Sequence, residues 1–218
     1  SLDPHHLVTT GTEGRTPFAR SSHLGTDFLH DHSYAAIDYA TVHVWAQRWG
    51  WAAHGVEAAA AMTRRYVALH VQLASRLNKP LVLEAVSFPR DANGTGPGGG
   101  TAGRDAFLRS VLGHALSRTV RVVDGTASQE ETRVQGVGIW AWAGEARPAQ
   151  AAGSTREGRL ISAAWWQLGD DLLGDPPSEV QGQSSVFDTD ATTLQVISEH
   201  ASRFIPPPPP SPPSPPPP

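Results

Sequence analysis

Short apolar runs alternate with amphipathic stretches along the first 205 residues, and this alternation is what most constrains the fold. The apolar runs recur near Val8, Ile37, Leu81 and Val137, at an average spacing of about 43 residues. Residues 56–77 carry apolar side chains at every third or fourth position, which is the pattern of an amphipathic helix. Strand–helix–strand repetition of this kind predicts parallel βα units.

We expect the strands at Leu7–Thr10, Ile37–Val44, Leu81–Leu83 and Val137–Trp142. We expect the helices at 56–77, Arg104–Ser117 and Thr192–Arg203, the last with Thr192 as its N-cap. Eight units at this spacing need roughly 340 residues, so 205 residues would make about half of an eight-fold βα barrel. The alternative is an open doubly wound sheet, but no Gly-rich phosphate loop joins a strand to a helix. The glycine run 94–100 is expected to be a surface loop.

The globular region, residues 1–205, is followed by a tail that reads PPPPPSPPSPPPP at 206–218. Proline fixes φ and has no amide hydrogen, so we expect a disordered, extended polyproline II tail. It could be a stiff spacer, a wall-associated stalk or a docking site for proline-binding modules. The chain opens at Ser1 without an initiator Met, which predicts that it begins inside a longer protein.

Composition excludes several classes of function. The 218 residues carry 17 Lys and Arg against 21 Asp and Glu, so no basic excess exists to neutralise nucleic-acid phosphates. There is no Cys, which excludes disulfides, thiolate metal sites and a Cys nucleophile. No apolar run approaches the roughly 20 residues that a membrane helix needs. Seven Trp and 39% hydrophobic residues are enough to build a core.

In a parallel βα barrel the functional groups lie at the carboxyl ends of the strands. The residues at or just past the expected strands include acidic, histidine and tryptophan side chains: Glu13, His43, Trp45, Trp49, Glu84, Trp140 and Trp142. Indole faces stack on sugar rings, while carboxylate and imidazole groups bind hydroxyls. The pattern therefore favours a carbohydrate cleft, although any single Trp could equally belong to the core.

Six sequence segments, in order, carry a family resemblance. They are DPHHLVTTGTEG, GTDF, IDYATVHVWAQRWGW, KPLVLEAVSFPRD, IWAWAGEARP and GDDLLGDPPSEVQGQSSVFDTDATT, which together run from about Asp3 to His200. This order resembles the C-terminal half of an endo-β-1,4-mannanase of glycoside hydrolase family 5. The resemblance implies an eight-fold βα barrel of which these pieces form strands five to eight. It also implies retaining hydrolysis of β-mannan without a cofactor.

The resemblance assigns roles to several of these residues. His43 matches the histidine at the end of strand six that contacts sugar and the catalytic carboxylates. Trp45 stands where many members have a Tyr that hydrogen-bonds the nucleophile, and an indole N–H can donate but not accept. Trp140, with Trp142 as the alternative, matches the Trp whose indole forms the floor of the sugar-binding subsite beside the scissile bond. Trp49 matches a cleft aromatic.

Two departures from the family pattern concern the catalytic carboxylates, of which a retaining enzyme needs two about 5–5.5 Å apart. The acid/base lies in an Asn-Glu-Pro motif, but Asn78 and Asn93 are followed here by Lys and Gly. Members typically read EEFGFPRD where this chain reads EAVSFPRD, so the ungapped nucleophile position is Ala85. Strand alternation would turn Glu84 to the opposite face. A one-residue bulge would instead bring Glu84 round to the site.

The sequence leaves alternatives open for other residues and for the function. His30, Asp31 and His32, with His23, could suggest a metal cluster, but we expect a solvated loop and no metal site. Asp188–Asp190 resembles part of a calcium loop, but we expect turn and cap residues. The leading hypothesis is a secreted, cell-wall mannanase relative that is inactive as this chain alone. The alternatives are a polysaccharide-binding relative without activity and a proline-rich wall protein whose tail contacts the cell-wall matrix.

Overall fold

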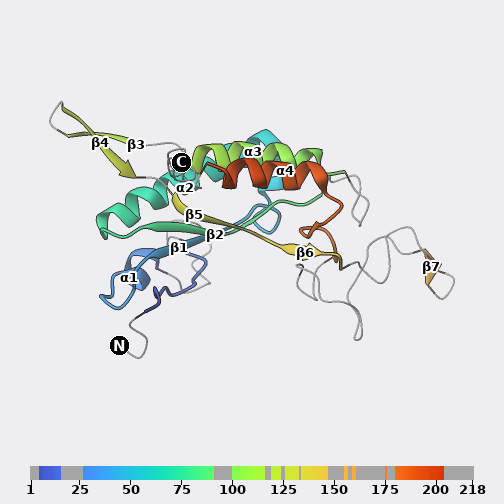
Figure 1. Ribbon diagram of the computed structural model, residues 1–218, viewed down its shortest axis with the longest axis horizontal. Coiled ribbons are helices and arrows are strands. Elements are labelled where there is room, and N and C mark those ends of the chain that lie inside the picture. Colours follow the sequence, from blue (N-terminus) through green and yellow to red (C-terminus); the bar gives the residue numbers. More distant parts are fainter. Residues whose placement is uncertain are drawn as a thin grey trace, which may run out of the picture.

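The fold is an α/β arrangement around three parallel strands. The computed structural model describes residues 5–15, 27–90, 100–115, 119–123, 126–132, 134–146, 155–156, 159–160, 175 and 180–203. The central sheet has the strand order β1-β2-β5, formed by Ala40–Trp45, Leu81–Ser87 and Val134–Ile139. Three helices lie on one side of this sheet (Figure 1): α2 (Val56–Arg76), α3 (Ala102–Ala115) and α4 (Ala191–Ala201). This confirms the expected α/β class with parallel strands.

Shorter elements complete the part of the chain that the structure describes. They are the helix α1 (Phe28–His32), the 3₁₀ turn η2 (Trp51–His54), the antiparallel pair β3 (Thr119–Val123) and β4 (Thr126–Thr132), the parallel pair β6 (Trp142–Gly144) and β9 (Val186–Phe187), and the antiparallel pair β7 (Thr155–Arg156) and β8 (Arg159–Leu160). The β3–β4 hairpin was not expected from the sequence. The proline tail, most of the glycine run and His23 lie outside the described residues.

The expected helices form close to their expected limits. The helix α2 matches residues 56–77 to within one residue, and α3 begins two residues before Arg104. The expected cap of the last helix was wrong, because Asp190 and not Thr192 is the N-cap of α4. Thr192 lies in the first turn, with its hydroxyl 3.0 Å from that of Thr101, which precedes α3.

The core lies between the sheet and the helices. Side chains of Val42, Val44, Leu81, Leu83 and Val86 are at most 2% exposed and pack against the helix layer. Burying one such side chain contributes about 1.5–3 kcal/mol. The side chains that alternate with these on β1 and β2 face the other side of the sheet. In the described part of the chain that side carries no helix layer (Figure 1).

The segment expected as the first strand, Leu7–Thr10, runs beside β1 but is not a strand. The N–H of Asp38 donates to the Val8 carbonyl at 2.8 Å, and the N–H of His43 donates to the Glu13 carbonyl at 3.0 Å. The two residues of each pair are equally far apart in the sequence, as residues paired between parallel strands are. The segment therefore lies where a fourth parallel strand would lie. The expectation of a regular strand is wrong, since its bonds to β1 are too sparse to form a ladder.

His32 explains why no ladder forms there. The Thr41 N–H donates to Nε2 of His32 at 3.2 Å, where a strand would use a carbonyl oxygen. Because Nε2 accepts, Nδ1 carries the ring proton and donates to the Phe28 carbonyl at 2.8 Å. The Thr10 hydroxyl lies 3.0 Å from the same Nε2. Gly14 follows with φ +74°, and a Cβ there would lie 2.7 Å from the Thr41 carbonyl oxygen.

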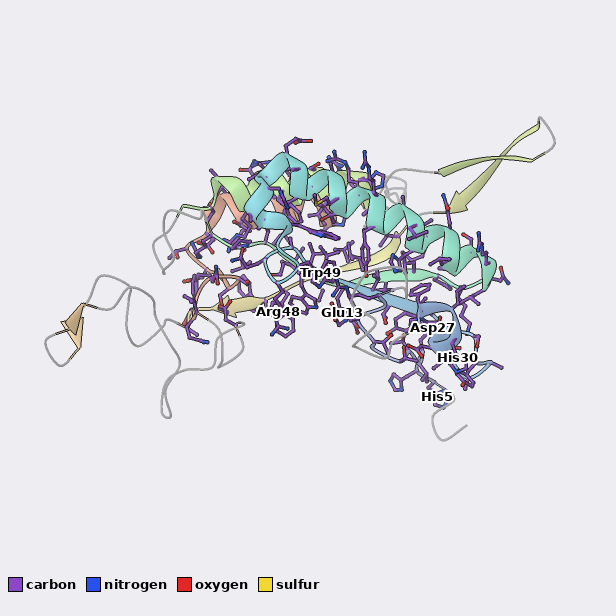
Figure 2. All side chains as sticks on the ribbon, turned by 180° about the vertical axis from the view of Figure 1, so that it is seen from behind. His5, Glu13, Asp27, His30, Arg48 and Trp49 are labelled. Carbon is purple, nitrogen blue, oxygen red and sulfur yellow. The ribbon has the colours of Figure 1, made fainter. Side chains whose placement is uncertain are left out.

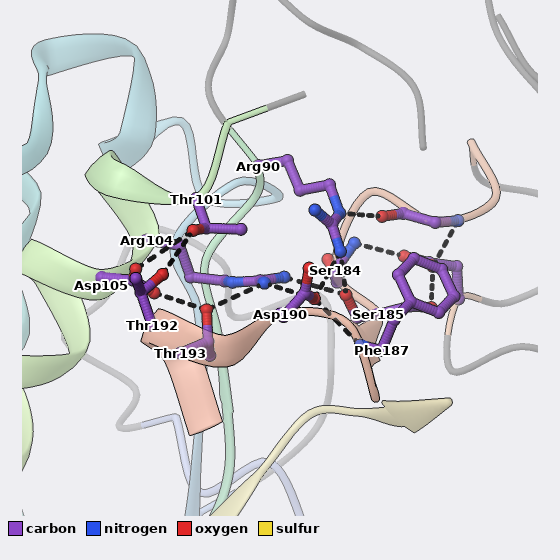
Figure 3. Close-up of polar contacts among 12 residues, drawn as sticks. Arg90, Thr101, Arg104, Asp105, Ser184, Ser185, Phe187, Asp190, Thr192 and Thr193 are labelled. Atoms are coloured by element: carbon purple, nitrogen blue, oxygen red, sulfur yellow. Dashed lines mark hydrogen bonds and ion pairs between the residues drawn. The ribbon is translucent and has the colours of Figure 1, made fainter. Parts of the chain in front are cut away.

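A buried cluster of charges fastens the segment after β2 to the start of α4 (Figure 3). The carboxylate of Asp190 is 7% exposed and accepts hydrogen bonds from Arg90, from Nη2 of Arg104 at 2.8 Å and from the Phe187 N–H at 2.9 Å. Nη1 of Arg104 also donates to the Ser185 carbonyl at 2.8 Å. The expectation that Asp190 is a cap residue is confirmed, and its pairing with two arginines adds a role that the sequence did not reveal.

Candidate functional site

The carboxyl halves of β1 and β2 bring a histidine and a carboxylate together. Nε2 of His43 lies 3.0 Å from Oε2 of Glu84, and their side chains are 18% and 40% exposed. Both belong to the face of the sheet that lies away from the helices. The pair is therefore in contact while its carboxylate remains open to solvent and to a ligand.

A β-bulge interrupts β2 at Glu84, between the residues that pair with Val42 and His43. On β1, Val42 pairs with Leu83 and His43 pairs with Ala85, so Glu84 is an extra residue between two successive pairs. Because Leu83 packs on the helix side, alternation places Glu84 on the face of His43, and the bulge then makes Ala85 the register partner of His43. Of the two arrangements that the sequence left open, the structure has the bulged one. Ala85 is buried at 4% exposure beside Glu84.

Two of the expected cleft tryptophans stand next to this pair. The ring of Trp45 is 5.7 Å from that of His43 and 5.3 Å from that of Trp140, with both contacts edge to face. Trp140 follows β5, and its N–H donates to the Val86 carbonyl at 2.9 Å. Its side chain is 37% exposed, so part of the indole is open to solvent beside Trp45.

The guanidinium of Arg48 lies 5.8 Å from the Trp45 ring centre, which adds a cation at the edge of these rings. Sequence reasoning did not single out this arginine. Its position directly before Trp49, in the segment after β1, was the available signal, because functional residues in parallel βα folds gather in such loops.

Trp49 belongs to a second aromatic group. Its ring contacts Trp51 at 4.7 Å and Tyr66 at 5.2 Å, and its Nε1 donates to the Glu13 carboxylate at 3.0 Å. Figure 2 shows Trp49 and Glu13 side by side. This group packs against the core, and burial raises the pKa of the Tyr66 hydroxyl well above its ordinary value. The structure thus places Trp49 mainly in packing, with one polar contact to the segment before β1.

Trp142 is the most exposed of the candidate tryptophans, at 63%. It begins β6, and its indole lies over Gly144, where a Cβ would be 3.3 Å from Nε1 of the ring. Among the described residues it makes none of the ring contacts that join Trp45, Trp140 and His43. The four candidate indoles therefore form a pair next to His43, one packed ring and one outlying ring.

The described residues offer no metal centre, because they contain no group of three or more His, Asp or Glu side chains that could hold an ion. The expectation of a solvated loop at residues 30–32 was wrong for His32. These residues close helix α1, and the His32 ring is fully buried, where desolvation lowers its pKa. No helix in the described part of the chain is long and apolar enough to cross a membrane.

Comparison with known proteins places the chain in a family. The family model described as "GH family 5 beta-mannosidase-like" matches residues 1–206. The chain belongs to glycoside hydrolase family 5. Its expected resemblance is thereby confirmed, and this family has the eight-fold βα barrel fold.

Similar proteins come from plants and a fungus. Mannan endo-1,4-beta-mannosidase 3 of Solanum lycopersicum is 32% identical over 120 residues, which is 51% of this chain and 28% of that protein. Mannan endo-1,4-beta-mannosidase 4 of Oryza sativa subsp. japonica is 25% identical over 218 residues, which is 93% of this chain and 38% of that protein. The crystal structure of a glycoside hydrolase family 5 mannosidase from Rhizomucor miehei superposes with a TM-score of 0.67 at 25% identity.

The match to that crystal structure covers 91% of this chain and 43% of the fungal one. The chain therefore spans less than half the length of the relatives that it resembles. The activity of a whole family 5 protein is thus a proposal for this chain rather than an observation.

Proposed function

We propose that this chain forms the nucleophile side of the cleft in an endo-β-1,4-mannanase. The single observation that carries the proposal is the 3.0 Å contact between Glu84 and His43 beside the Trp45–Trp140 pair. The contact lies toward the carboxyl ends of parallel strands, where βα barrels hold their active sites. The family match and the plant mannanase relatives support mannan as the substrate.

In the proposed reaction, the Glu84 carboxylate attacks the anomeric carbon of a β-1,4-mannosidic bond and forms a glycosyl ester, which water then hydrolyses with overall retention. His43 orients the carboxylate through its Nε2 contact. Trp140 stacks on the sugar ring next to the scissile bond. The departing oxygen needs a proton from a second carboxyl group, which the family carries in an Asn-Glu-Pro motif. That motif is missing from this sequence, so another part of the protein must supply it.

We further propose that the chain makes strands five to eight of the barrel and works outside the cell in the wall. The consecutive parallel strands and the coverage of the fungal structure support the half-barrel arrangement. The plant relatives support the location. The proline tail would then contact the wall matrix.

The test measures release of reducing ends from galactomannan by the full-length protein that contains this chain. Glu84→Gln removes the nucleophilic oxygen while keeping the side chain's size, and we expect activity to fall by at least about 10³-fold. Glu57→Gln is the matched control, because Glu57 is an 86% exposed glutamate on α2. Equal activity of Glu84→Gln and the parent would remove Glu84 from the mechanism.

A non-catalytic, mannan-binding role is the second candidate, and Ala85 at the family's nucleophile position favours it. In that case the parent releases no reducing ends but is retarded in mannan-affinity electrophoresis. Trp140→Ala should then abolish the retardation, because it removes the exposed indole. Ala85→Glu should restore hydrolysis if the missing carboxylate alone accounts for inactivity, and continued inactivity would reject that explanation.

A further inference from the structure

We infer that Gly138, on β5, is a positioning residue for the Glu84 carboxylate. The inference rests on the proposed function for its activity readout only. The role proposed for Gly138 requires no contact with His43 or with a substrate. It acts through the backbone of the neighbouring strand.

The bulge in β2 is visible from both neighbouring strands. The neighbours Val42 and His43 on β1 pair with Leu83 and Ala85 on β2, so Glu84 is left without a partner on β1. On the β5 side, Leu83 pairs with Val137 and Val86 pairs with Ile139. Two residues therefore lie between these pairs on β2, but only Gly138 lies between them on β5. The extra residue therefore lies on β2 at Glu84, and both neighbouring strands register it there.

At the bulge, the Glu84 carbonyl lies against β5 at Gly138. A Cβ built on Gly138 would lie 2.3 Å from the Glu84 carbonyl oxygen and 3.3 Å from its carbonyl carbon. A backbone carbonyl in a paired strand cannot rotate away as the end of a long side chain can. Any side chain at Gly138 thus requires β2 to withdraw by about 1 Å to reach ordinary contact.

Gly136 shows that this need is specific to one position. It lies on the same strand and the same face as Gly138, two residues earlier. A Cβ there would meet only the two methyl groups of Val82, each at 3.6 Å, which is ordinary van der Waals contact. The sequence thus contains a matched control in which the same substitution adds the same methyl group without displacing the backbone.

Withdrawal of β2 moves the Glu84 side chain relative to His43 and the sugar. A misplacement of about 1 Å in a catalytic group can reduce the rate about 100-fold. The carboxylate belongs to the residue that the bulge inserts between Leu83 and Ala85. A residue that permits the bulge therefore controls where the carboxylate lies.

The experiment compares Gly138→Ala, Gly136→Ala and Glu84→Gln in the full-length protein labelled with ¹⁵N-histidine. We expect Gly138→Ala to move the ring nitrogen signals of His43 in the same direction as Glu84→Gln does. It should also lower kcat on galactomannan about 100-fold with little change in KM. Gly136→Ala should leave both the signals and kcat at the parent values.

The outcomes separate the two claims. Parent-like His43 signals and parent-like kcat in a folded Gly138→Ala protein would overturn the positioning role. Unchanged hydrolysis in Glu84→Gln would instead overturn the proposed function, while the His43 signals would still decide the positioning role. If Gly138→Ala does not fold, the same substitution is made in a chain lacking Ala85, whose β2 has no extra residue. Folding in that background supports the inference, and failure there overturns it.

Discussion

Replacing Asp190 by Asn should destabilise the fold strongly, because this carboxylate is the common partner of two buried arginines. Arg90 and Arg104 are 5% and 1% exposed and both reach Asp190, which also accepts the Phe187 N–H. Burial alone would raise the pKa of Asp190. The hydrogen bonds from Arg90, the Phe187 N–H and Arg104 outweigh burial and hold the pKa below its ordinary value. The carboxylate is therefore ionised in the folded protein.

The size of the effect follows from what remains after the substitution. Asn can still accept one hydrogen bond, but it removes the carboxylate that both desolvated guanidinium groups share and leaves Asp105 as the nearby negative charge for Arg104. Removing one partner of a buried ion pair costs about 3–5 kcal/mol. Because Asn retains part of the bonding, we expect about 3 kcal/mol. For a domain of this size that corresponds to a Tm lower by about 6–12 °C.

Thermal unfolding followed by circular dichroism at pH 7 measures this loss. The control is Asp188→Asn, two residues earlier on an exposed side chain, which should change stability by less than about 0.5 kcal/mol. The depressed pKa makes the Asp190 contribution complete above the unfolded value of 3.8, and it is lost as the pH falls through the folded pKa. The reasoning fails if Asp190→Asn lowers Tm no more than Asp188→Asn does.

Further predictions concern the packing beneath the site. Burial lowers the pKa of both His32 and His70 below 6.5. Because the unfolded chain then binds protons more readily than the folded one, the free energy of unfolding should fall as the pH drops below about 6.5. A pH-independent stability between pH 7.5 and 5 would contradict this. Gly14→Ala should destabilise by several times the roughly 1 kcal/mol expected for Gly11→Ala. Both glycines have positive φ, but only at Gly14 would the added Cβ meet a backbone oxygen, at 2.7 Å. Equal losses in chemical denaturation would refute that difference. Phe28→Ala, at a ring that is fully buried between the two histidines, should cost about 3–5 kcal/mol in the same assay.

The helix layer and the order of the strands could be predicted from the sequence because they depend on local patterns. The amphipathic spacing in residues 56–77 identified α2 to within one residue, and the apolar runs located β1, β2 and β5. The residues at the strand ends were also identified, including His43 and Glu84. The β3–β4 hairpin escaped prediction, since β4 reads TASQEET and gives no apolar alternation to recognise, although β3 reads TVRVV.

The tertiary structure decided features that depend on contacts between distant parts of the chain. Asp190 meets Arg90 across 100 residues, and no local pattern marks such a pair. His32 is buried because its ring nitrogen takes the place of a carbonyl oxygen beside β1, which a run of polar residues does not indicate. Both cases arise from the need to satisfy buried polar groups, and that need appears only when the elements pack.

The sequence by itself determined that a carboxylate would stand at residue 84 on a parallel strand of a family 5 fold. It did not determine the direction of that carboxylate. Alternation counted back from the family's nucleophile position at Ala85 predicts the opposite face. In the structure Glu84 instead follows Leu83 of the helix side and lies at a bulge beside His43, with Gly138 of the neighbouring strand leaving room for the Glu84 carbonyl. Side-chain direction in a strand is a local property while the ladder is regular. Where the ladder is broken, the neighbouring backbone decides it.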